Sequence, residues 1–231
     1  IKGLNFNKSN TLAILKLSLP VFIGRFLFSF GKVYVNSTAS AVYDKMAVGA
    51  LGISNVMAGL LSNMINSFED ASSTIISQNY GASNGRRIQK CFFINMVYIL
   101  AMSVIGTIVL FALKNNIAEF FAPGNLEYQE KIVNIFKWEC MDIIFMGLNG
   151  VGMAVFYGFG KTRVTMALSM STLFAFRIPV LLFLMYVVKM DYEACGIAMF
   201  TSNLLTGVIC FIISLIFILR MPKNTKYKML F

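Results

Sequence analysis

A small set of ionisable side chains lies within stretches of sequence that are otherwise almost wholly apolar. Among them are Arg25, Lys32, Glu69, Asp70, Glu139, Asp142 and Arg177. If these stretches cross a bilayer, each charge costs about 2.5–3.5 kcal/mol at mid-membrane on insertion scales, and it persists only where it pairs or faces a polar cavity. The candidates for ion coupling or substrate binding are Glu69, Asp70, Glu139, Asp142 and Arg177.

Glu139 and Asp142 are three positions apart, so on a helix they share one face. Two carboxylates on one face suit a bound cation or a shared proton, because like charges held close disfavour ionisation of both. A second interpretation is structural, with Arg177 or Arg25 paired to Glu69 only to lock helices together. Lys32 and Glu139 could also reach the membrane surface without any role. Both interpretations stay open at this stage.

The composition shows which classes of protein the chain can belong to. Apolar residues make up 58% of the chain, charged residues only 13%, and mean hydropathy is +0.73. An ordinary globular domain has about 45–50% apolar and about 25% charged residues. The chain therefore lacks the polar side chains that a water-soluble surface needs. This excludes a soluble enzyme, a nucleic-acid-binding module and a secreted disulfide scaffold.

Six apolar runs are each close to the roughly 20 residues that a helix needs to cross a bilayer. They cover residues 11–36, 47–80, 88–113, 132–159, 164–188 and 196–219, with a short amphipathic stretch at 115–121. None shows the alternation of a barrel strand. We therefore expect an all-α polytopic membrane protein, a single six-helix bundle over 1–231 with a basic tail at 220–231. Pro20 and Pro179 interrupt two of the helices and are candidate bending points.

The charges outside the runs are distributed unevenly between the two sides. The termini and the loops after the second and fourth runs hold eleven cations and no acid: Lys2, Lys8, Arg86, Arg87, Lys90, Lys161, Arg163, Arg220, Lys223, Lys226 and Lys228. The other loops hold four, namely Lys45, Lys114, Lys131 and Lys189. Short loops rich in Lys and Arg face the cytoplasm. We expect a cell-membrane protein with both ends of this segment cytoplasmic, whose basic clusters meet anionic lipid headgroups, not nucleic acid.

Other sequence features predict no cofactor and no catalysis. The four cysteines have no CxxC spacing, and the chain has no His, so neither a disulfide nor a metal site is expected. Gly160-Lys161-Thr162 ends like a phosphate-binding loop, but position 155 is Val where that motif needs Gly. The chain begins at Ile1 without a cleavable signal, and we interpret it as a fragment or processed piece of a longer protein.

Several motifs together resemble the multidrug and toxic compound extrusion (MATE) transporters. Gln78-Asn79-Tyr80-Gly81-Ala82, followed by Arg86-Arg87, is similar to the family's signature at the end of its second helix. Supporting matches in the family's order are Pro20, Gly158, Gly160, Lys161, Arg177, Pro179 and Gly196. The matches extend over nearly the whole chain.

The resemblance implies more than the residues do. Family members have two six-helix lobes around a central cavity, and they export cationic or amphiphilic compounds in exchange for Na⁺ or H⁺. This chain would be one lobe, of the C-terminal kind. Its partners would be the bilayer, a small-molecule drug or metabolite, and the second lobe, in cis or as another chain. Such lobes carry functional acids in their first, second and fourth helices. Here Glu69, Glu139 and Asp142 match, whereas the first helix has Arg25 and Lys32 instead of an acid.

Three alternatives remain beside antiport. A lipid-linked oligosaccharide flippase of similar architecture would use Arg25, Lys32 and Arg177 to bind a pyrophosphate. A membrane-embedded enzyme would use the acids as acid and base, although no catalytic motif is present. The chain could also be an inactive or truncated half-transporter. Arg177 lies too deep in its helix to reach the surface easily, so we expect it to have a carboxylate partner or to face water. If the chain exports cations, the charge of Arg177 should be neutralised by free carbonyls near Pro179 or by one of Glu69, Glu139 and Asp142.

Overall fold

The computed structural model describes residues 8–221, with side chains described from Thr11 onward, and this part of the chain is helical without a strand. The first four long helices and the last are α1 (Lys8–Val42), α2 (Lys45–Gly81), α3 (Gly85–Phe121), α4 (Leu126–Gly158) and α7 (Glu193–Leu219). The fifth span consists of α5 (Thr162–Met170), η1 (Ser171–Arg177), α6 (Ile178–Leu182) and η2 (Phe183–Val187). All six spans are long and apolar enough to cross a membrane, which confirms the predicted fold class.

The helices extend beyond the apolar runs that predict them. α3 continues without a break through Phe121, so the amphipathic stretch 115–121 is not a separate element. α1 continues to Val42, past the expected end at 36, and α4 begins at Leu126 instead of 132. An apolar run marks the thickness of the hydrocarbon layer, whereas a helix ends only where a cap or a turn residue stops it. The tail from Pro222 onward lies outside the described residues.

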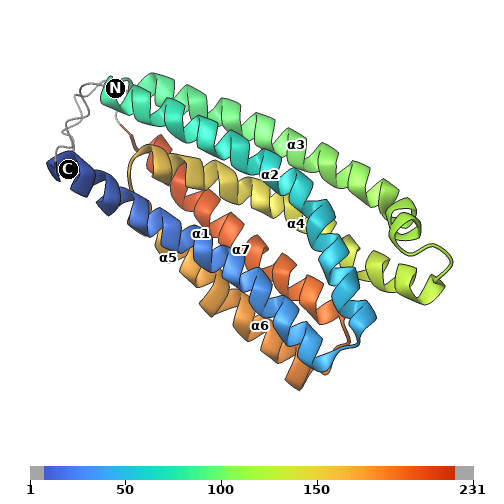
Figure 1. Ribbon diagram of the computed structural model, residues 1–231. Helices are drawn as coiled ribbons and strands as arrows, with labels where there is room; N and C mark the ends of the chain where they lie inside the picture. The colour runs from blue at the N-terminus through green and yellow to red at the C-terminus, as the bar shows by residue number, and fades with distance from the viewer. Residues whose placement is uncertain (1–7, 222–231) are drawn as a thin grey trace, which may run out of the picture.

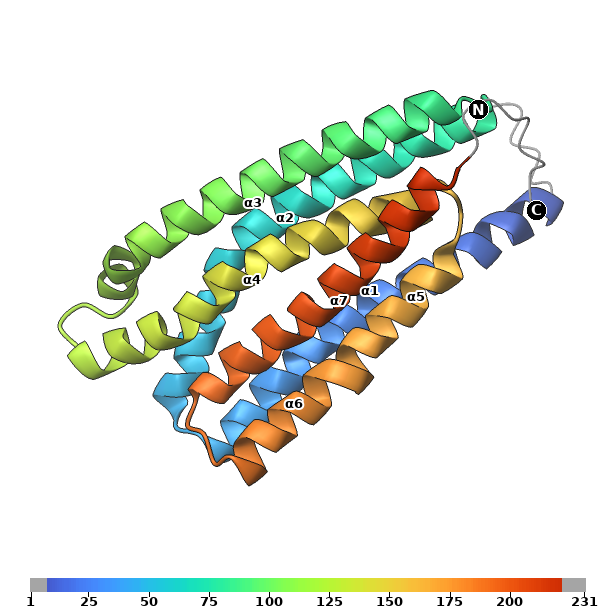
Figure 2. The ribbon, with the colours of Figure 1, turned by 180° about the vertical axis from the view of Figure 1, so that it is seen from behind.

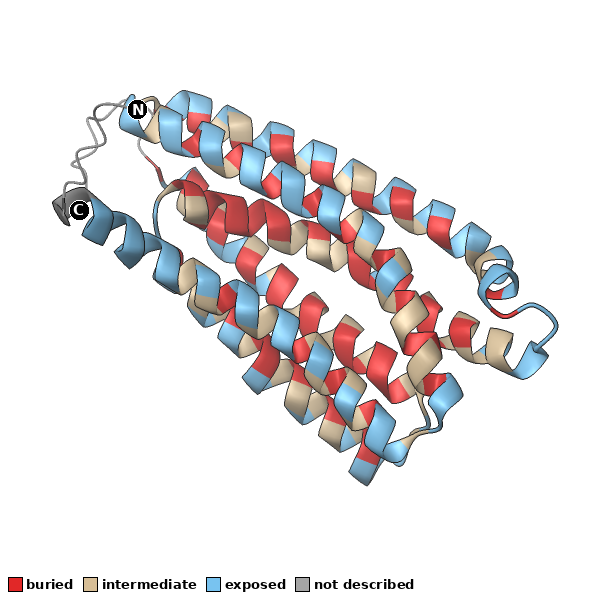
Figure 3. Cartoon of the chain, in the orientation of Figure 1, coloured by how far each residue is buried: buried red, intermediate tan, exposed pale blue. Residues whose placement is uncertain are grey.

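α4 is the central helix of the bundle. It packs against α2, α3 and α7, whereas α1 packs mainly against α5 (Figures 1 and 2). The most apolar window of α4 is 61% buried, against 6% for α1. Figure 3 shows the same contrast, with buried residues throughout α4 and α7 and an exposed first half of α1. α1 is therefore the helix held least by packing within this chain.

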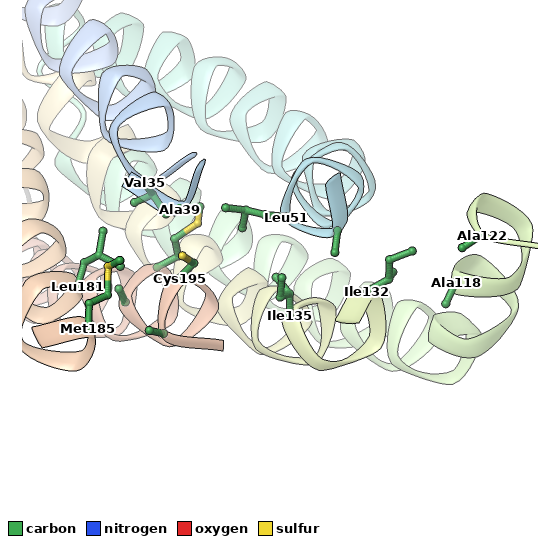
Figure 4. Close-up of a cluster of buried hydrophobic side chains, with 14 residues drawn as sticks. Val35, Ala39, Leu51, Ala118, Ala122, Ile132, Ile135, Leu181, Met185 and Cys195 are labelled. Atoms are coloured by element: carbon green, nitrogen blue, oxygen red, sulfur yellow. The ribbon is translucent and has the colours of Figure 1, made fainter. Parts of the chain in front are cut away.

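One apolar cluster joins α1 to the other helices at the end of the bundle that carries the α1–α2 loop, here called the Asp44 end. Val35 and Ala39 of α1 meet Leu51 of α2, Ile135 of α4 and Cys195 of α7 in this cluster (Figure 4). The residues are nearly inaccessible, and burial of this kind stabilises by about 25 cal/mol for each Å² of apolar surface. The opposite end, which carries the α2–α3 loop, is called the Arg86 end. It holds the start of α1.

A polar contact also ties α2 to α4 at the Asp44 end. Asp44 is the N-cap of α2 and accepts a hydrogen bond from the backbone N–H of Ala47 at 2.8 Å. The ammonium group of Lys131 in α4 donates to Asp44 and, at 3.0 Å, to Glu127. The Lys131 ammonium group and the Ala47 N–H both hold the pKa of Asp44 below its usual range.

The fifth span departs from a uniform α-helix. Two π-helical segments, η1 and η2, flank the short helix α6, and Pro179 lies in the first turn of α6. Proline has no backbone N–H and clashes with the preceding turn of an α-helix. Wider π turns accommodate such a break and are frequent at functional sites. The single α-helix predicted over 164–188 is thus wrong in its middle, whereas Pro20 lies within a continuous α1.

The family-motif residues at the ends of α2 and α4 belong to two similar helix stops. At the end of α4, Gly160 has φ +67°, and the N–H groups of Gly160 and Lys161 donate to the carbonyls of Tyr157 and Phe156 at 2.9 and 2.8 Å. This is a Schellman cap. At the end of α2 the left-handed residue is Ser83, φ 55°, and not Gly81, which is still helical. Gln78 and Asn79 accept the cap hydrogen bonds from Ala82 and Asn84.

Gly152 allows α4 and α7 to pack closely. A Cβ atom there would lie 2.9 Å from the backbone oxygen of Cys210, closer than real Cβ contacts. Gly147 and Gly150 of the same helix face Ser103 and Ile65 at similarly short range. These small residues therefore set the distances between α4 and its neighbours.

Gly152→Ala is expected to destabilise the bundle by about 1–3 kcal/mol, because the added methyl group must push against backbone. Gly59→Ala is the matched control. It is also helical, but a Cβ there meets nothing within 4 Å, so a gain of up to about 1 kcal/mol in helix propensity is expected. Thermal unfolding of the purified variants in detergent measures both. Equal effects of the two substitutions would contradict the packing argument.

Candidate functional site

A half-open cavity of about 190 Å³ lies between α1, α2, α4 and α5. We call it the Glu69 cavity. Its charged wall consists of Arg25 and Glu69, and its polar wall includes Asn66, Asn149 and Tyr157. The Oδ1 atom of Asn149 is buried without a hydrogen-bond partner among the described residues. The cavity thus combines polar and apolar walls.

Arg25 contacts both acids of α2. Its Nη2 atom donates to Oδ1 of Asp70 at 2.6 Å and lies 3.7 Å from Oε1 of Glu69. Its guanidinium group also lies over the ring of Tyr157, 5.8 Å from the centroid. Glu69 is buried, Asp70 is exposed, and no hydrogen bond to the Glu69 carboxylate is present in the described part of the chain. The predicted pairing of Arg25 with Glu69 is therefore confirmed as an ion pair without a hydrogen bond.

A second polar group, the Asp142 network, joins the fifth span to α7 and α4. Arg177 donates from Nε to Ser202 Oγ at 3.1 Å and from Nη2 to Asn203 Oδ1 at 2.9 Å. The amide nitrogen of Asn203 donates to Asp142 Oδ2 at 2.7 Å. Asn203 therefore stands between a buried cation and a buried carboxylate, with one amide group satisfying both.

Arg177 does not have the direct carboxylate partner that the sequence analysis predicts. Among the described side chains, the ion pairs of the bundle involve Arg25, Lys131 and Lys137, and Arg177 has none. Its side chain is 1% exposed, so it does not face water either. The hydroxyl of Ser202, the amide of Asn203 and the ring of Phe28, 5.2 Å from the guanidinium carbon, surround it instead.

Glu139 and Asp142 are both buried and each keeps one oxygen free of protein partners. Glu139 is 2% exposed, so it lies within the bundle, and the alternative in which it reaches the membrane surface does not apply. Oε1 of Glu139 and Oδ1 of Asp142 have no hydrogen-bond donor among residues 11–221. The positive charges acting on Glu139 are those of Lys32 and Arg177. Two buried carboxylates with unused oxygens are a place where a proton or a small cation can bind.

Phe28 and Gly31 of α1 connect the two polar groups. Phe28 lines the Glu69 cavity and its ring also covers Arg177. A Cβ at Gly31 would lie 3.1 Å from Nη1 of Arg177, so a larger residue there would crowd the guanidinium group. α1 thus meets both groups through Phe28 and lies against Arg177 at Gly31, and a shift of α1 would reach both.

The residues around Arg177 that the sequence-based prediction missed are neutral. Ser202, Asn203 and Thr206 form a polar face on α7 that meets η1, where Thr172 donates to Thr206 Oγ1 at 2.9 Å. Their spacing of one and four positions in an apolar helix is the signal that could have identified them. Lys137 was also missed, and it pairs with Glu193 at 3.2 Å near the Asp44 end.

Comparison with known proteins identifies the family of this chain. The model of the MatE family matches residues 20–183. The chain belongs to this family. The resemblance that the motifs carry is thereby confirmed. No curated protein matches the chain by sequence.

Solved MATE structures have the same fold. A multidrug resistance MATE family transporter in its outward-facing conformation superposes with a TM-score of 0.85 at 12% identity, over 94% of this chain and 49% of that one. The eukaryotic MATE transporter AtDTX14 gives 0.80 at 17% identity, over 87% and 45%. A variant of the Vibrio cholerae MATE transporter VcmN gives 0.78 at 17%, over 94% and 49%. The MatE chain described here spans about half the length of these transporters, the size of one lobe.

The bridging role of Asn203 predicts a specific loss of stability. Asn203→Ala removes the acceptor of Arg177 and the donor to Asp142, leaving two buried charged groups without these bonds. Asn95→Ala is the control, because Asn95 is as buried as Asn203 (5% and 4% exposed) and its Oδ1 already lacks a partner. We expect Asn203→Ala to cost about 1.5–3 kcal/mol more than Asn95→Ala in thermal unfolding. Equal losses would show that the bridge contributes nothing.

Proposed function

We propose that this chain is one lobe, of the C-terminal kind, of a secondary active transporter. The transporter exports cationic or amphiphilic small molecules by antiport with Na⁺ or H⁺. The observation that carries the proposal is the Glu69 carboxylate, which is buried, lines a cavity and accepts no hydrogen bond in the described structure. An anionic group of this kind can take a cation from the cavity without first breaking a strong internal bond. The second lobe, in cis or as another chain, would complete the pathway.

Glu139 and Asp142 are the candidates for ion coupling. Oε1 of Glu139 and Oδ1 of Asp142 are hard oxygen ligands without protein donors, which suits Na⁺ or a proton. In alternating access, a lobe rocks against its partner and exposes the substrate site to one side at a time. An ion that binds one of the two states more tightly shifts the equilibrium toward that state. The ion gradient can thereby drive export.

The flippase alternative finds no support in the position of Arg177. Binding a lipid pyrophosphate requires a guanidinium group that the substrate can reach, whereas Arg177 is enclosed by Ser202, Asn203 and Phe28. Among the arginines that alternative invokes, Arg25 is accessible, but its Nη2 atom is held by two acids. Cation export therefore fits the described charges better.

Glu69→Gln and Asp142→Asn are each expected to abolish efflux of ethidium by the full-length protein while membrane abundance stays normal. The reason is that an amide keeps the shape of the carboxylate but removes the charge that binds the cation. Fluorescence of ethidium-loaded cells measures efflux, and immunoblotting of membranes measures abundance. Glu130→Gln is the control, because Glu130 is exposed and makes none of the ion pairs.

Unchanged efflux in both variants would leave the carboxylates with a structural role only, and loss of abundance in place of efflux would indicate the same role. Proteoliposomes given either a Na⁺ gradient or a pH gradient then distinguish the two coupling ions. The inactive-half alternative corresponds to no efflux by the parent protein under either gradient.

We also propose that the Arg86 end faces the cytoplasm of a cell whose plasma membrane holds the protein. The start of α1, the α2–α3 and α4–α5 connections and the end of α7 all lie at this end (Figure 1). Its exposed cations are Arg86, Arg87, Lys90, Lys161, Arg163 and Arg220. Short connections rich in Lys and Arg remain on the cytoplasmic side.

A cysteine replacing Ser83, in a background without the four native cysteines, should react with an impermeant maleimide only after the membrane is opened. Ser83 lies in the short turn between α2 and α3 at the Arg86 end. A cysteine at Pro123, in the exposed α3–α4 turn at the other end, is the control and should react in intact cells. The reverse pattern of labelling would invert the proposed orientation.

A further inference from the structure

Asp70 and Glu69 compete for a single guanidinium group. They are consecutive in α2, so their side chains leave the helix about 100° apart, and one is exposed while the other is buried. Arg25 reaches them from α1 with the same atom, Nη2. The 2.6 Å distance to Asp70 is that of a charge-assisted hydrogen bond, whereas the 3.7 Å distance to Glu69 is too long for one. The guanidinium group is therefore bonded to the exposed acid.

Charge and burial alone would favour a bond from Arg25 to Glu69 over the bond to Asp70. At equal distance, a buried carboxylate attracts a cation more strongly than an exposed one, because water screens the exposed pair. The Asp70 side chain is 57% exposed and that of Glu69 only 10%. A movement of about 1 Å would bring Nη2 into hydrogen-bond distance of Glu69.

We propose that Asp70 is a positioning residue that holds Arg25 off Glu69 and thereby keeps the Glu69 carboxylate open to the cavity. The inference rests on the proposed function, in which Glu69 takes a cation from that cavity. Asp70 itself need not touch the substrate. Without the Asp70 charge, Arg25 closes onto Glu69, neutralises it and competes with any cation that enters. The first-helix Arg, where the family resemblance implies an acid, then becomes an internal inhibitor of the site.

The strength of the coupling between Arg25 and Glu69 can be measured without any transport assay. Arg25→Gln, Glu69→Gln and the double variant are made both in the parent protein and together with Asp70→Asn, and thermal unfolding of the full-length protein is followed in detergent. The non-additivity of the two Gln substitutions reports the coupling between Arg25 and Glu69. We expect it to grow by about 2–4 °C in melting temperature in the Asp70→Asn background. Non-additivity that is unchanged or smaller overturns the proposal.

Two control variants separate charge from shape. Glu130→Gln also converts an exposed carboxylate to an amide, and it should leave the coupling between Arg25 and Glu69 as in the parent. Asp70→Glu keeps the charge and should behave like the parent. The proposal also requires that Asp70→Asn folds, because Arg25 finds a new partner in Glu69. If Asp70→Asn and Asp70→Ser both fail to accumulate while Asp70→Glu does, Asp70 has a structural role and the proposal is wrong.

Ethidium efflux supplies the functional readout. Asp70→Asn should raise the half-saturating ethidium concentration by about tenfold, because Arg25 competes for Glu69, with a smaller change in maximum rate. Adding Arg25→Gln should return the half-saturating concentration toward the parent value, a rescue that a merely structural role of Asp70 would not give. No rescue contradicts the proposal. If the parent protein does not export ethidium, that part of the proposed function fails. The unfolding measurement still decides whether Asp70 weakens the coupling between Arg25 and Glu69.

Discussion

The interior of this bundle depends on stabilising a positive charge that has no access to water. Arg177 is 1% exposed in a helix that spans the hydrocarbon layer, and its cost must be offset by groups within the chain. A carboxylate in direct contact would do so, but a tight ion pair would also occupy the acid. The amide of Asn203 accepts from Arg177 and donates to Asp142, so both charges are satisfied and one oxygen of Asp142 stays free. A neutral bridge thus stabilises the cation without using up the carboxylate.

α4 can hold such groups because its surface alternates between close packing and polar side chains. Gly147 and Gly152 bring α3 and α7 close to its backbone, which excludes lipid from the contacts. Glu139 and Asp142, which precede Gly147, are buried by the neighbouring helices, and the half-buried Asn149 lies between Gly147 and Gly152. Gly150 has a further effect, since a Cβ there would lie 3.5 Å from Oε2 of Glu69. The same small residues that tighten the bundle therefore leave room for its buried acids.

The sequence predicts the spans and the acids, and it fails where tertiary contacts decide. Hydropathy finds six helices because the bilayer requires long apolar runs. It cannot find the π-helical segments around Pro179, since a shift of backbone hydrogen bonds leaves no trace in composition. The second apolar run is predicted to end at 80, next to the motif residue Gly81, but the helix includes Gly81 and the chain takes its left-handed turn at Ser83. Likewise Arg177 attracts the prediction of a carboxylate, whereas the polar residues nearest to it belong to α7, a helix 25 positions further along the chain.

The two ends of α1 are held by different forces, and this difference bears on how the lobe could move. Near the Asp44 end, Val35 and Ala39 are enclosed in the apolar cluster, which stabilises one packed arrangement and resists small displacements. Toward the Arg86 end the helix is largely exposed; it packs there against α5, with Gly24 close to Met166, and Arg25 provides its ion pairs to α2. A shift of about 1 Å is enough for an ion pair to change partners. A packed core resists a shift of that size. A displacement of this half of α1 would move Phe28, which lines the cavity and covers Arg177, and would therefore reach both polar groups.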